Sequence, residues 1–281
     1  MKGKSEAMTA STIESLNFLR GYIQMADDGV QMGWHERNGG NFSYRLTAED
    51  VEQAKPFFHE PGEWAPTQVD VPNLAGEYFL VTGTGKFMRN IVRNPEDSLA
   101  IAEIDAQGKN YRLVWGLKNG GRPTSEFPTH LLNQSIKKGI NPKYRVLYHA
   151  HPINTIALTF VLPLEDKAFT QEIWSMMTEC PVIFPEGIGV VPWMPPGGWE
   201  IALASAEKIR KYDILVWAHH GVFCSGADFD QTFGLMEAVE KSATISVKVR
   251  SMGGKRQTMT VENFRQLAEV FHLDMREEFL E

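Results

Sequence analysis

Two histidines separated by a single residue stand at the end of a predicted buried strand. His149 and His151 follow the apolar run that starts at Tyr144. Side chains two positions apart on a strand point to the same face, so both imidazoles can converge on one point. Neutral imidazole is a preferred ligand of zinc and related divalent metals. Taken alone, this pair is a weak motif that more often marks two half-buried structural histidines.

Two adjacent histidines follow another predicted strand. His219 and His220 come directly after the run 214–218 and are followed by Gly221. Ligands of α/β sheets collect outside the carboxyl ends of strands. A third imidazole there would complete a site with an open coordination position, as in catalytic zinc centres. Because successive side chains of a strand point to opposite faces, only one of His219 and His220 can face such a site. The sequence periodicity does not show which one it is.

Two glutamates are candidates for proton transfer. Glu126 stands in the first turn of a predicted helix, where an acid interacts favourably with free backbone N–H groups. It could also serve as a general base, a general acid or a metal ligand. Glu179 precedes Cys180 and a short predicted strand, where a lone acid is usually a solvated end. From the residues alone, helix-end electrostatics is the first interpretation of Glu126.

Two glycine-rich turns offer backbone N–H groups that suit a phosphate. They are Asn-Gly-Gly-Asn at 38–41 and Thr-Gly-Thr-Gly-Lys at 82–86. The second is not a Walker A loop, because no glycine stands six residues before Lys86 and Phe87 replaces the required hydroxyl residue. As isolated turns, both are more often structural.

The other histidines and the cysteines are predicted to be structural. We expect surface or helix-face positions for His35, His59, His130 and His272. Cys180 and Cys224 are expected to be small apolar packing residues, since no electropositive motif accompanies either. They form neither a Cys-x-x-Cys motif nor a disulfide framework, which favours a reducing compartment.

The composition is that of an ordinary globular protein. The 281 residues include 28 Lys and Arg against 35 Asp and Glu, a net charge of −7. Hydrophobic residues at 43% and charged residues at 22% exclude disordered and fibrous classes. Without a block of basic residues, nucleic acid and anionic membranes are not expected partners. No signal peptide or membrane-spanning stretch is recognised, so we expect a cytoplasmic protein.

The elements that must position these residues alternate along the chain. Helices are predicted at 13–32, 125–138, 153–161, 166–177, 199–211, 229–252 and 261–271, and strands at 42–46, 78–81, 100–104, 111–115, 144–149, 182–184 and 214–218. Ser125 is expected to cap the second helix and Gly139 to stop it. The proline-bearing stretch 52–76 is predicted to be a surface excursion.

The polar connection 105–109 favours an antiparallel hairpin, and the sheet is therefore mixed. We predict a single α/β domain over 1–281, with a mixed central sheet covered by helices on both faces.

Five motifs stand in an order that resembles the class II aldolase/adducin family. They are Trp34–Asn41, Thr82–Phe87, Pro123–Glu126, His149–His151 and His220–Phe223. The resemblance covers nearly the whole chain. Flanking segments, among them 178–180, 184–187 and 192–194, are similar to those of bacterial members that act on L-rhamnulose 1-phosphate. The resemblance implies a zinc-dependent lyase of rhamnose catabolism, which cleaves this ester reversibly to dihydroxyacetone phosphate and L-lactaldehyde.

The same resemblance implies a role for each matched residue. His149, His151 and His220 match the ligands of one zinc per subunit, which selects His220 over His219. Glu126 matches the catalytic acid/base, and Glu179 a glutamate that reaches into a neighbouring subunit's site, which implies a homotetramer. The positions around the substrate phosphate are matched by Asn38, Asn41, Thr84, Gly85, Thr124 and Ser125. His219 is expected to lie behind the ligands or to be packed away.

Other functions remain open at this stage. Members of the same family cleave L-fuculose 1-phosphate or epimerise L-ribulose 5-phosphate, and a substrate panel would separate these reactions. An adducin-like assembly module without catalysis would not need an open three-histidine site, so zinc content would discriminate it. A zinc hydrolase is less favoured, because the chain has no His-Glu-x-x-His motif.

Overall fold

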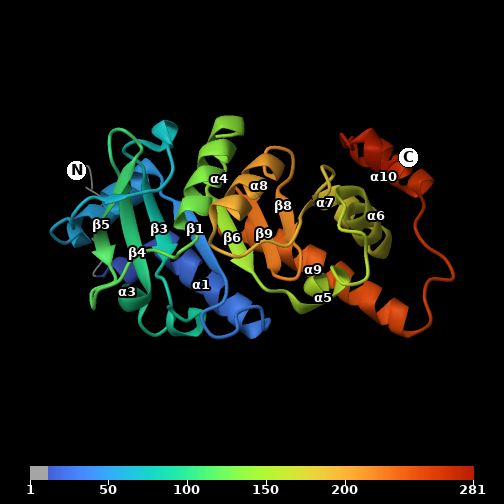
Figure 1. The fold of residues 1–281 in the computed structure, drawn as a ribbon, viewed down its shortest axis with the longest axis horizontal. Helices are drawn as coiled ribbons and strands as arrows, with labels where there is room; N and C mark the ends of the chain where they lie inside the picture. The colour runs from blue at the N-terminus through green and yellow to red at the C-terminus, as the bar shows by residue number, and fades with distance from the viewer. Residues whose placement is uncertain (1–11) are drawn as a thin grey trace, which may run out of the picture.

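A single sheet runs through the computed structural model, which describes residues 12–281 (Figure 1). Its nine strands lie in the order β2-β5-β4-β3-β1-β6-β9-β8-β7. The strand pair β7 and β8 is parallel and the other neighbours are antiparallel, so the predicted mixed sheet is confirmed. Among the helices of residues 12–281, none is long and apolar enough to cross a membrane. Most of the N-terminal segment in which we recognise no signal peptide lies outside the described residues.

The elements have the following bounds. The strands are β1 (Asn41–Arg45), β2 (Ala65–Pro66), β3 (Tyr78–Thr82), β4 (Leu99–Ile104), β5 (Asn110–Gly116), β6 (Val146–Ala150), β7 (Gly189–Val191), β8 (Ile214–Trp217) and β9 (Gly221–Gly226). The helices are α1 (Asn17–Gln31), α2 (Ala48–Ala54), α3 (Pro95–Ser98), α4 (Phe127–Ile140), α5 (Ile153–Leu158), α6 (Asp166–Met176), α7 (Cys180–Ile183), α8 (Trp199–Lys208), α9 (Phe229–Ser251) and α10 (Val261–Phe271).

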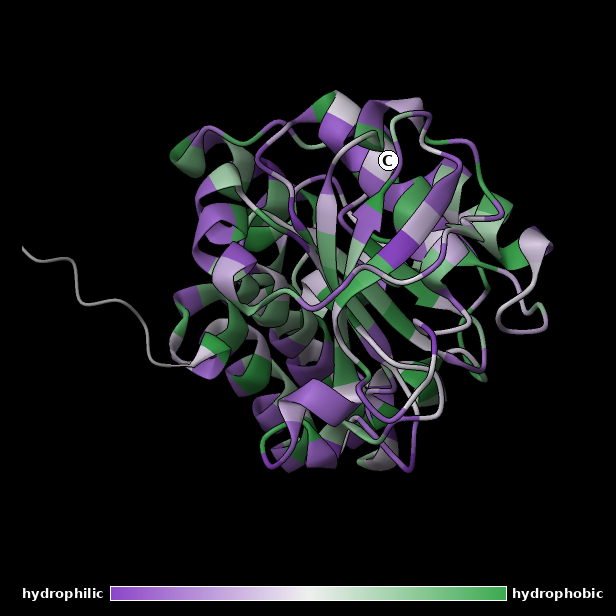
Figure 2. Cartoon of the chain, turned by 90° about the vertical axis from the view of Figure 1, so that its left-hand side faces the viewer, coloured by the Kyte–Doolittle hydropathy of each residue, from purple (hydrophilic) through white to green (hydrophobic). Residues whose placement is uncertain are grey.

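Helices cover both faces of the sheet, and strand alternation decides which residues each face receives. Phe42 of β1 stacks on Tyr22 of α1, with ring centroids 3.7 Å apart, and α1 in turn packs against α9. The next residue, Ser43, turns to the opposite face and contacts α4, which packs against α8. Figure 2 shows apolar residues concentrated on the central strands, whereas the surrounding helices alternate between apolar and polar residues. The residues with candidate roles in chemistry lie on the face of the sheet that α4 covers, which we call the α4 face.

Most predicted elements are found in place, including the 105–109 hairpin between β4 and β5. The strand predicted at 182–184 is wrong. That segment lies in and just after the helical turn α7, where Pro181 occupies the first turn, a position that suits proline because no N–H is needed there. The strand of this region is β7, a few residues later, and the prediction missed it along with β9.

The predicted ends of the helix that bears Glu126 are also wrong. The N-cap of α4 is Glu126 rather than Ser125, and a proline stands in its first turn. The helix continues through Gly139 to Ile140, because a single glycine costs only about 1 kcal/mol, which tertiary packing overrides. The stretch 52–76 holds more structure than predicted: α2 ends in it and the edge strand β2 lies within it.

Candidate active site

Three imidazoles meet where β6 ends and β9 begins. One ring nitrogen from each of His149, His151 and His220 lies within 4.8 Å of the other two. His149 belongs to β6, and His220 stands just before β9. The antiparallel pairing of these strands places Ala150 opposite Val222. Residues from two segments distant in sequence are therefore brought to one point at the edge of the α4 face.

The imidazole nitrogens that remain free are suited to a metal. Nδ1 of His149 contacts the Val222 carbonyl oxygen at 3.0 Å, and Nδ1 of His151 contacts Oε1 of Glu36 at 2.7 Å. Within the described residues, Nε2 of both rings is buried and has no hydrogen-bond partner. A buried ring nitrogen is rarely left unpaired, and one whose other nitrogen is held by an oxygen is typical of a metal ligand. The donor set therefore fits a divalent metal such as zinc.

Burial keeps the rings of His149 and His220 neutral, the form that binds metal. The pKa of His220 is lowered to about 4, first by burial and then by the neighbouring His151. Burial also lowers the pKa of His149 well below its ordinary value, and the other two rings of the cluster add to the effect. Protonated imidazole cannot act as a ligand, so this electrostatic environment favours metal binding over proton binding.

Gly221 allows the three rings to approach one another. A Cβ atom at this position would lie 2.4 Å from the Ala150 carbonyl oxygen and within 3.0 Å of ring carbons of His151 and His149. The absence of a side chain is thus a steric requirement of the cluster.

Glu126 lies beside the cluster at the start of α4. Its Oε2 is 4.0 Å from Nε2 of His149 and accepts a hydrogen bond of 2.8 Å from Nδ2 of Asn41. Asn41 is the cross-strand partner of His149, which places both side chains on the α4 face. Burial raises the pKa of the Glu126 carboxyl, while the Asn41 hydrogen bond and the neighbouring His151 act in the opposite direction. A carboxyl in this setting is suited to exchanging a proton.

A cavity of about 180 Å³ connects the cluster with the glycine-rich turns. Its lining includes every residue expected at the substrate phosphate, together with the three histidines and Glu126: Asn38, Asn41, Thr84, Gly85, Thr124 and Ser125. Two backbone hydrogen bonds stabilise the rim of the cavity. The Thr84 N–H donates to the Arg122 carbonyl oxygen at 2.9 Å, and the Thr124 N–H donates to the Thr82 carbonyl oxygen at 2.8 Å. A glycine-rich loop and a helix N-terminus thus face one cavity, an arrangement that suits an anion.

The predicted site residue Glu179 lies outside this cavity, and so does His219, the histidine that was not selected as a ligand. Glu179 is an exposed residue at the start of α7 and does not line the cavity of its own chain. His219 is exposed as well, so of its two expected placements, behind the ligands or packed away, the second is wrong. Its Nδ1 lies 3.0 Å from the Thr159 hydroxyl and its ring packs on Phe160. The left-handed backbone of His219, with a φ of 59°, sends the chain into the turn that presents His220.

His130 lies on a face of α4, one of its two expected placements, but this face is buried and not at the surface. His130 is 0% exposed, and its Nε2 lies 2.5 Å from Oδ1 of Asn41. The signal that could have found it is spacing, because His130 follows Glu126 by four residues and shares its helix face. Glu36, which contacts His151, was also missed, although it stands inside a recognised motif.

The other residues predicted to be structural mostly agree with the structure. His59 and His272 are exposed, and Cys180 and Cys224 are buried and free. His35 is half-buried, and its two ring nitrogens contact the Gly39 carbonyl oxygen at 3.0 Å and the Tyr148 hydroxyl at 2.8 Å.

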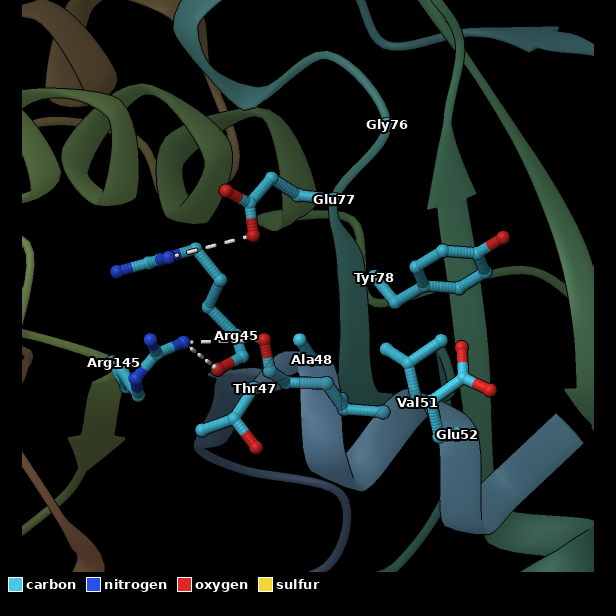
Figure 3. Close-up of a pocket in the computed structure, with 10 residues that line it drawn as sticks. Arg45, Thr47, Ala48, Val51, Glu52, Gly76, Glu77, Tyr78 and Arg145 are labelled. Atoms are coloured by element: carbon cyan, nitrogen blue, oxygen red, sulfur yellow. Dashed lines mark hydrogen bonds and ion pairs between the residues drawn. The ribbon is translucent and has the colours of Figure 1, made fainter.

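A larger cavity of about 400 Å³ lies at the opposite end of β1 (Figure 3). Its charged groups are paired with one another, with the backbone or with a neighbouring charged residue, as Glu52 is with Lys55. Arg45 contacts Glu77 at 3.4 Å, and Nη1 of Arg145 donates to the carbonyl oxygens of Arg45 and Leu46, both at 3.1 Å. These groups hold the strand end in place, so we assign the chemistry to the smaller cavity.

Comparisons with known proteins agree with this geometry. Residues 22–247 match the family described as the Class II Aldolase and Adducin N-terminal domain. A rhamnulose-1-phosphate aldolase of Mannheimia succiniciproducens is 48% identical over 90% of this chain and 94% of its own. A rhamnulose-1-phosphate aldolase of Pectobacterium atrosepticum is 44% identical over 90% of this chain and 93% of its own. The crystal structure of a sugar-phosphate aldolase from Thermotoga maritima superposes with a TM-score of 0.72 at 29% identity, covering 85% of this chain and 97% of that one.

Proposed function

The chain belongs to the class II aldolase and adducin family, and we propose that it cleaves L-rhamnulose 1-phosphate reversibly to dihydroxyacetone phosphate and L-lactaldehyde. The observation that carries this proposal is the three-histidine cluster with Glu126 only 4.0 Å from His149, in a cavity rimmed by anion-binding turns. The curated relatives that bear the name of this activity support the choice of sugar. All strands that carry the site belong to one sheet, which supports treating the chain as a single domain.

We propose that His149, His151 and His220 hold one zinc ion per subunit. When bound, zinc would supply a Lewis acid for the carbonyl and adjacent hydroxyl oxygens of the substrate. The buried, unpaired Nε2 atoms of His149 and His151 support this assignment.

Glu126 would act as the general acid or base at the reacting carbon. In the cleavage direction the bond between C3 and C4 of the ketose breaks, and its electron pair remains on C3. In its protonated form, Glu126 gives a proton to C3 to form dihydroxyacetone phosphate, and its carboxylate removes this proton again in the direction of synthesis. The turns and the N-terminus of α4 would hold the phosphate through Asn38, Asn41, Thr84, Gly85, Thr124 and Ser125, which keeps C3 within reach of the carboxyl.

The proton of the C4 hydroxyl needs a second acceptor, since this hydroxyl becomes the aldehyde oxygen. We assign that role to Glu179 of a neighbouring subunit, in a homotetramer. The exposure of Glu179 and its position outside the cavity of its own chain support this assignment. A cytoplasmic location is part of the same proposal, supported by the two buried free cysteines.

Complementation between two inactive variants would test the shared site. Glu126→Gln and Glu179→Gln are each expected to lose most activity. When they are mixed, dissociated and reassembled, sites with Glu126 from one chain and Glu179 from the other should regain activity. Each variant reassembled alone is the control. If mixing restores nothing although mixed oligomers form, Glu179 does not act across a subunit boundary.

Glu36 is expected to strengthen zinc binding through His151. Its carboxylate accepts the hydrogen bond from Nδ1–H of His151, which fixes the tautomer that presents Nε2 to the cavity. Loss of such an outer partner commonly costs about 10- to 100-fold in metal affinity. Glu36→Ala should therefore weaken zinc affinity in competition with a chelator, and Glu60→Ala, at an exposed acid elsewhere, is the control. Equal affinities in both variants would contradict this role.

Release of dihydroxyacetone phosphate tests the proposed function directly. It should be measured from L-rhamnulose 1-phosphate and from L-fuculose 1-phosphate, before chelation, after chelation and after zinc is restored. We expect preference for the rhamnulose ester, lost with the metal and regained with it. Preference for the fuculose ester would correct the substrate. Release from neither ester by the zinc-loaded protein would overturn the aldolase proposal in favour of the epimerase or the assembly module.

A further inference from the structure

A line of hydrogen bonds runs through buried side chains to Glu126. Its members alternate between β1 and α4, and each is 7% exposed or less: Gln134, Ser43, His130, Asn41 and Glu126. Along this line the donor–acceptor distances are 3.4, 2.9, 2.5 and 2.8 Å. We call these five residues the Glu126 chain.

The spacing of these residues explains why they meet. Glu126, His130 and Gln134 follow one another at four-residue steps and so form one stripe on α4. Asn41 and Ser43 are two positions apart on β1 and so face the same side of the sheet. The helix stripe lies over the strand, and each side contributes alternate members of the chain.

The chemistry of the groups gives every bond in the chain the same direction. An ionised carboxylate only accepts, so Asn41 must turn its amide nitrogen toward Glu126 and its oxygen toward His130. Nε2 of His130 must then carry a hydrogen and donate a hydrogen bond to this oxygen. Burial lowers the pKa of His130 to about 3, so the ring is neutral and its Nδ1 accepts from the Ser43 hydroxyl. Gln134 anchors the far end through the Arg145 carbonyl oxygen at 2.8 Å.

We propose that His130 is a positioning residue of the reaction: by donating to Asn41 it fixes the orientation of the Asn41 amide, which in turn holds the Glu126 carboxylate beside the metal-binding histidines. This inference rests on the proposed function, in which Glu126 exchanges a proton with the substrate. It assigns His130 no contact with substrate or metal.

The consequence for Glu126 concerns which of its oxygens can react. Oε2 is engaged by the Asn41 amide, which leaves Oε1 to take and return the proton. Without a donor at position 130, the Asn41 amide can rotate by half a turn and present its oxygen to the carboxylate. Two acceptors would then face each other, and Glu126 would leave its position.

Proton exchange into dihydroxyacetone phosphate isolates the step that this proposal concerns. The zinc-loaded full-length protein is incubated with dihydroxyacetone phosphate in D2O, and deuterium incorporation at the reacting carbon is followed by NMR. Both ketose 1-phosphates considered above share this product, so the experiment does not depend on which sugar is cleaved.

His130→Leu removes the donor and should slow exchange by about 10- to 100-fold, the cost of misplacing a catalytic group. KM and zinc content should change little. His130→Met, which also lacks a donor, replaces this variant if it does not fold. Asn133→Leu is the matched control, because Asn133 is buried on the same helix and its side chain has no hydrogen-bond partner within the described residues. Its exchange rate should match that of the unmodified protein.

Two further variants distinguish positioning from general structural support. His130→Gln can still donate toward Asn41 and should recover most of the exchange rate. In a Glu126→Gln background, His130→Leu should add little to the loss, because His130 acts through Glu126. A purely structural residue would lower the residual rate in that background too.

Three results would overturn the inference. They are an unchanged exchange rate in His130→Leu, a glutamine variant as slow as the leucine variant, or fully additive losses in the double variant. Failure of the proposed aldolase activity is a separate result, since the unmodified, zinc-loaded protein would then catalyse no exchange.

Discussion

Glu126→Gln is expected to lower turnover by about 10²- to 10⁴-fold, the contribution typical of a positioned acid or base. Glutamine keeps the size of the side chain and an oxygen that can accept from Asn41, but it cannot take up and return a proton. Zinc content should stay close to one per subunit, because the cluster consists of the three histidines. Turnover and bound zinc are measured on the same preparation.

Glu186→Gln is a matched control for this prediction. Glu186 is another shielded carboxyl, and burial raises its pKa to about 7, but it does not line the cavity of the site. The same chemical change there should leave turnover unaltered. If the Glu126 variant turned over normally, or lost its zinc, Glu126 would not be the proton-exchanging group.

His220→Asn is expected to abolish stable zinc binding, and the same change at the adjacent His219 should not. His220 belongs to the cluster, whereas His219 contacts Thr159 and packs on Phe160. Removal of a ligand should cost more than the roughly 10- to 100-fold typical of outer partners. Asparagine suits the control, because it tolerates the left-handed conformation of His219.

Zinc affinity by chelator competition and activity without added metal are the measurements for this pair. Neither variant should change the overall fold, which circular dichroism checks. If His219→Asn lost the metal and His220→Asn kept it, the assignment of the third ligand would be reversed.

The sequence pattern predicted the mixed sheet and most of the helices, and the family resemblance supplied most of the residues that line the cavity. Short-range rules were sufficient where the two-residue period of a strand dominates, as for His149 and His151 at the end of β6. They could not choose between His219 and His220, because the choice depends on a left-handed residue within the turn. The resemblance to a family selected His220, the member that the structure places in the cluster.

Long-range packing accounts for what the sequence did not predict. The sequence around His130 does not distinguish it from other helix residues. Its role depends on the packing of α4 across β1, which makes Asn41 its hydrogen-bond partner. The ends of α4 were misplaced because Ser125 and Gly139 carry local signals that Pro128 and the packed helix face override. The strand predicted at 182–184 failed for a similar reason, because Pro181 favours a helical turn.

The pairing of distant segments around His149 has a thermodynamic consequence. Asn41 and Glu126 are 85 positions apart, and His149 and Val222 are 73 apart. The ligands therefore have their mutual geometry only when these long loops are closed, and the unfolded chain cannot offer it. Metal binding and folding are then linked equilibria: each tenfold excess of free zinc over its dissociation constant adds about 1.4 kcal/mol to the free energy of unfolding. A metal bound to the three histidines would thus also stabilise the fold, because it would hold together segments that are distant in sequence.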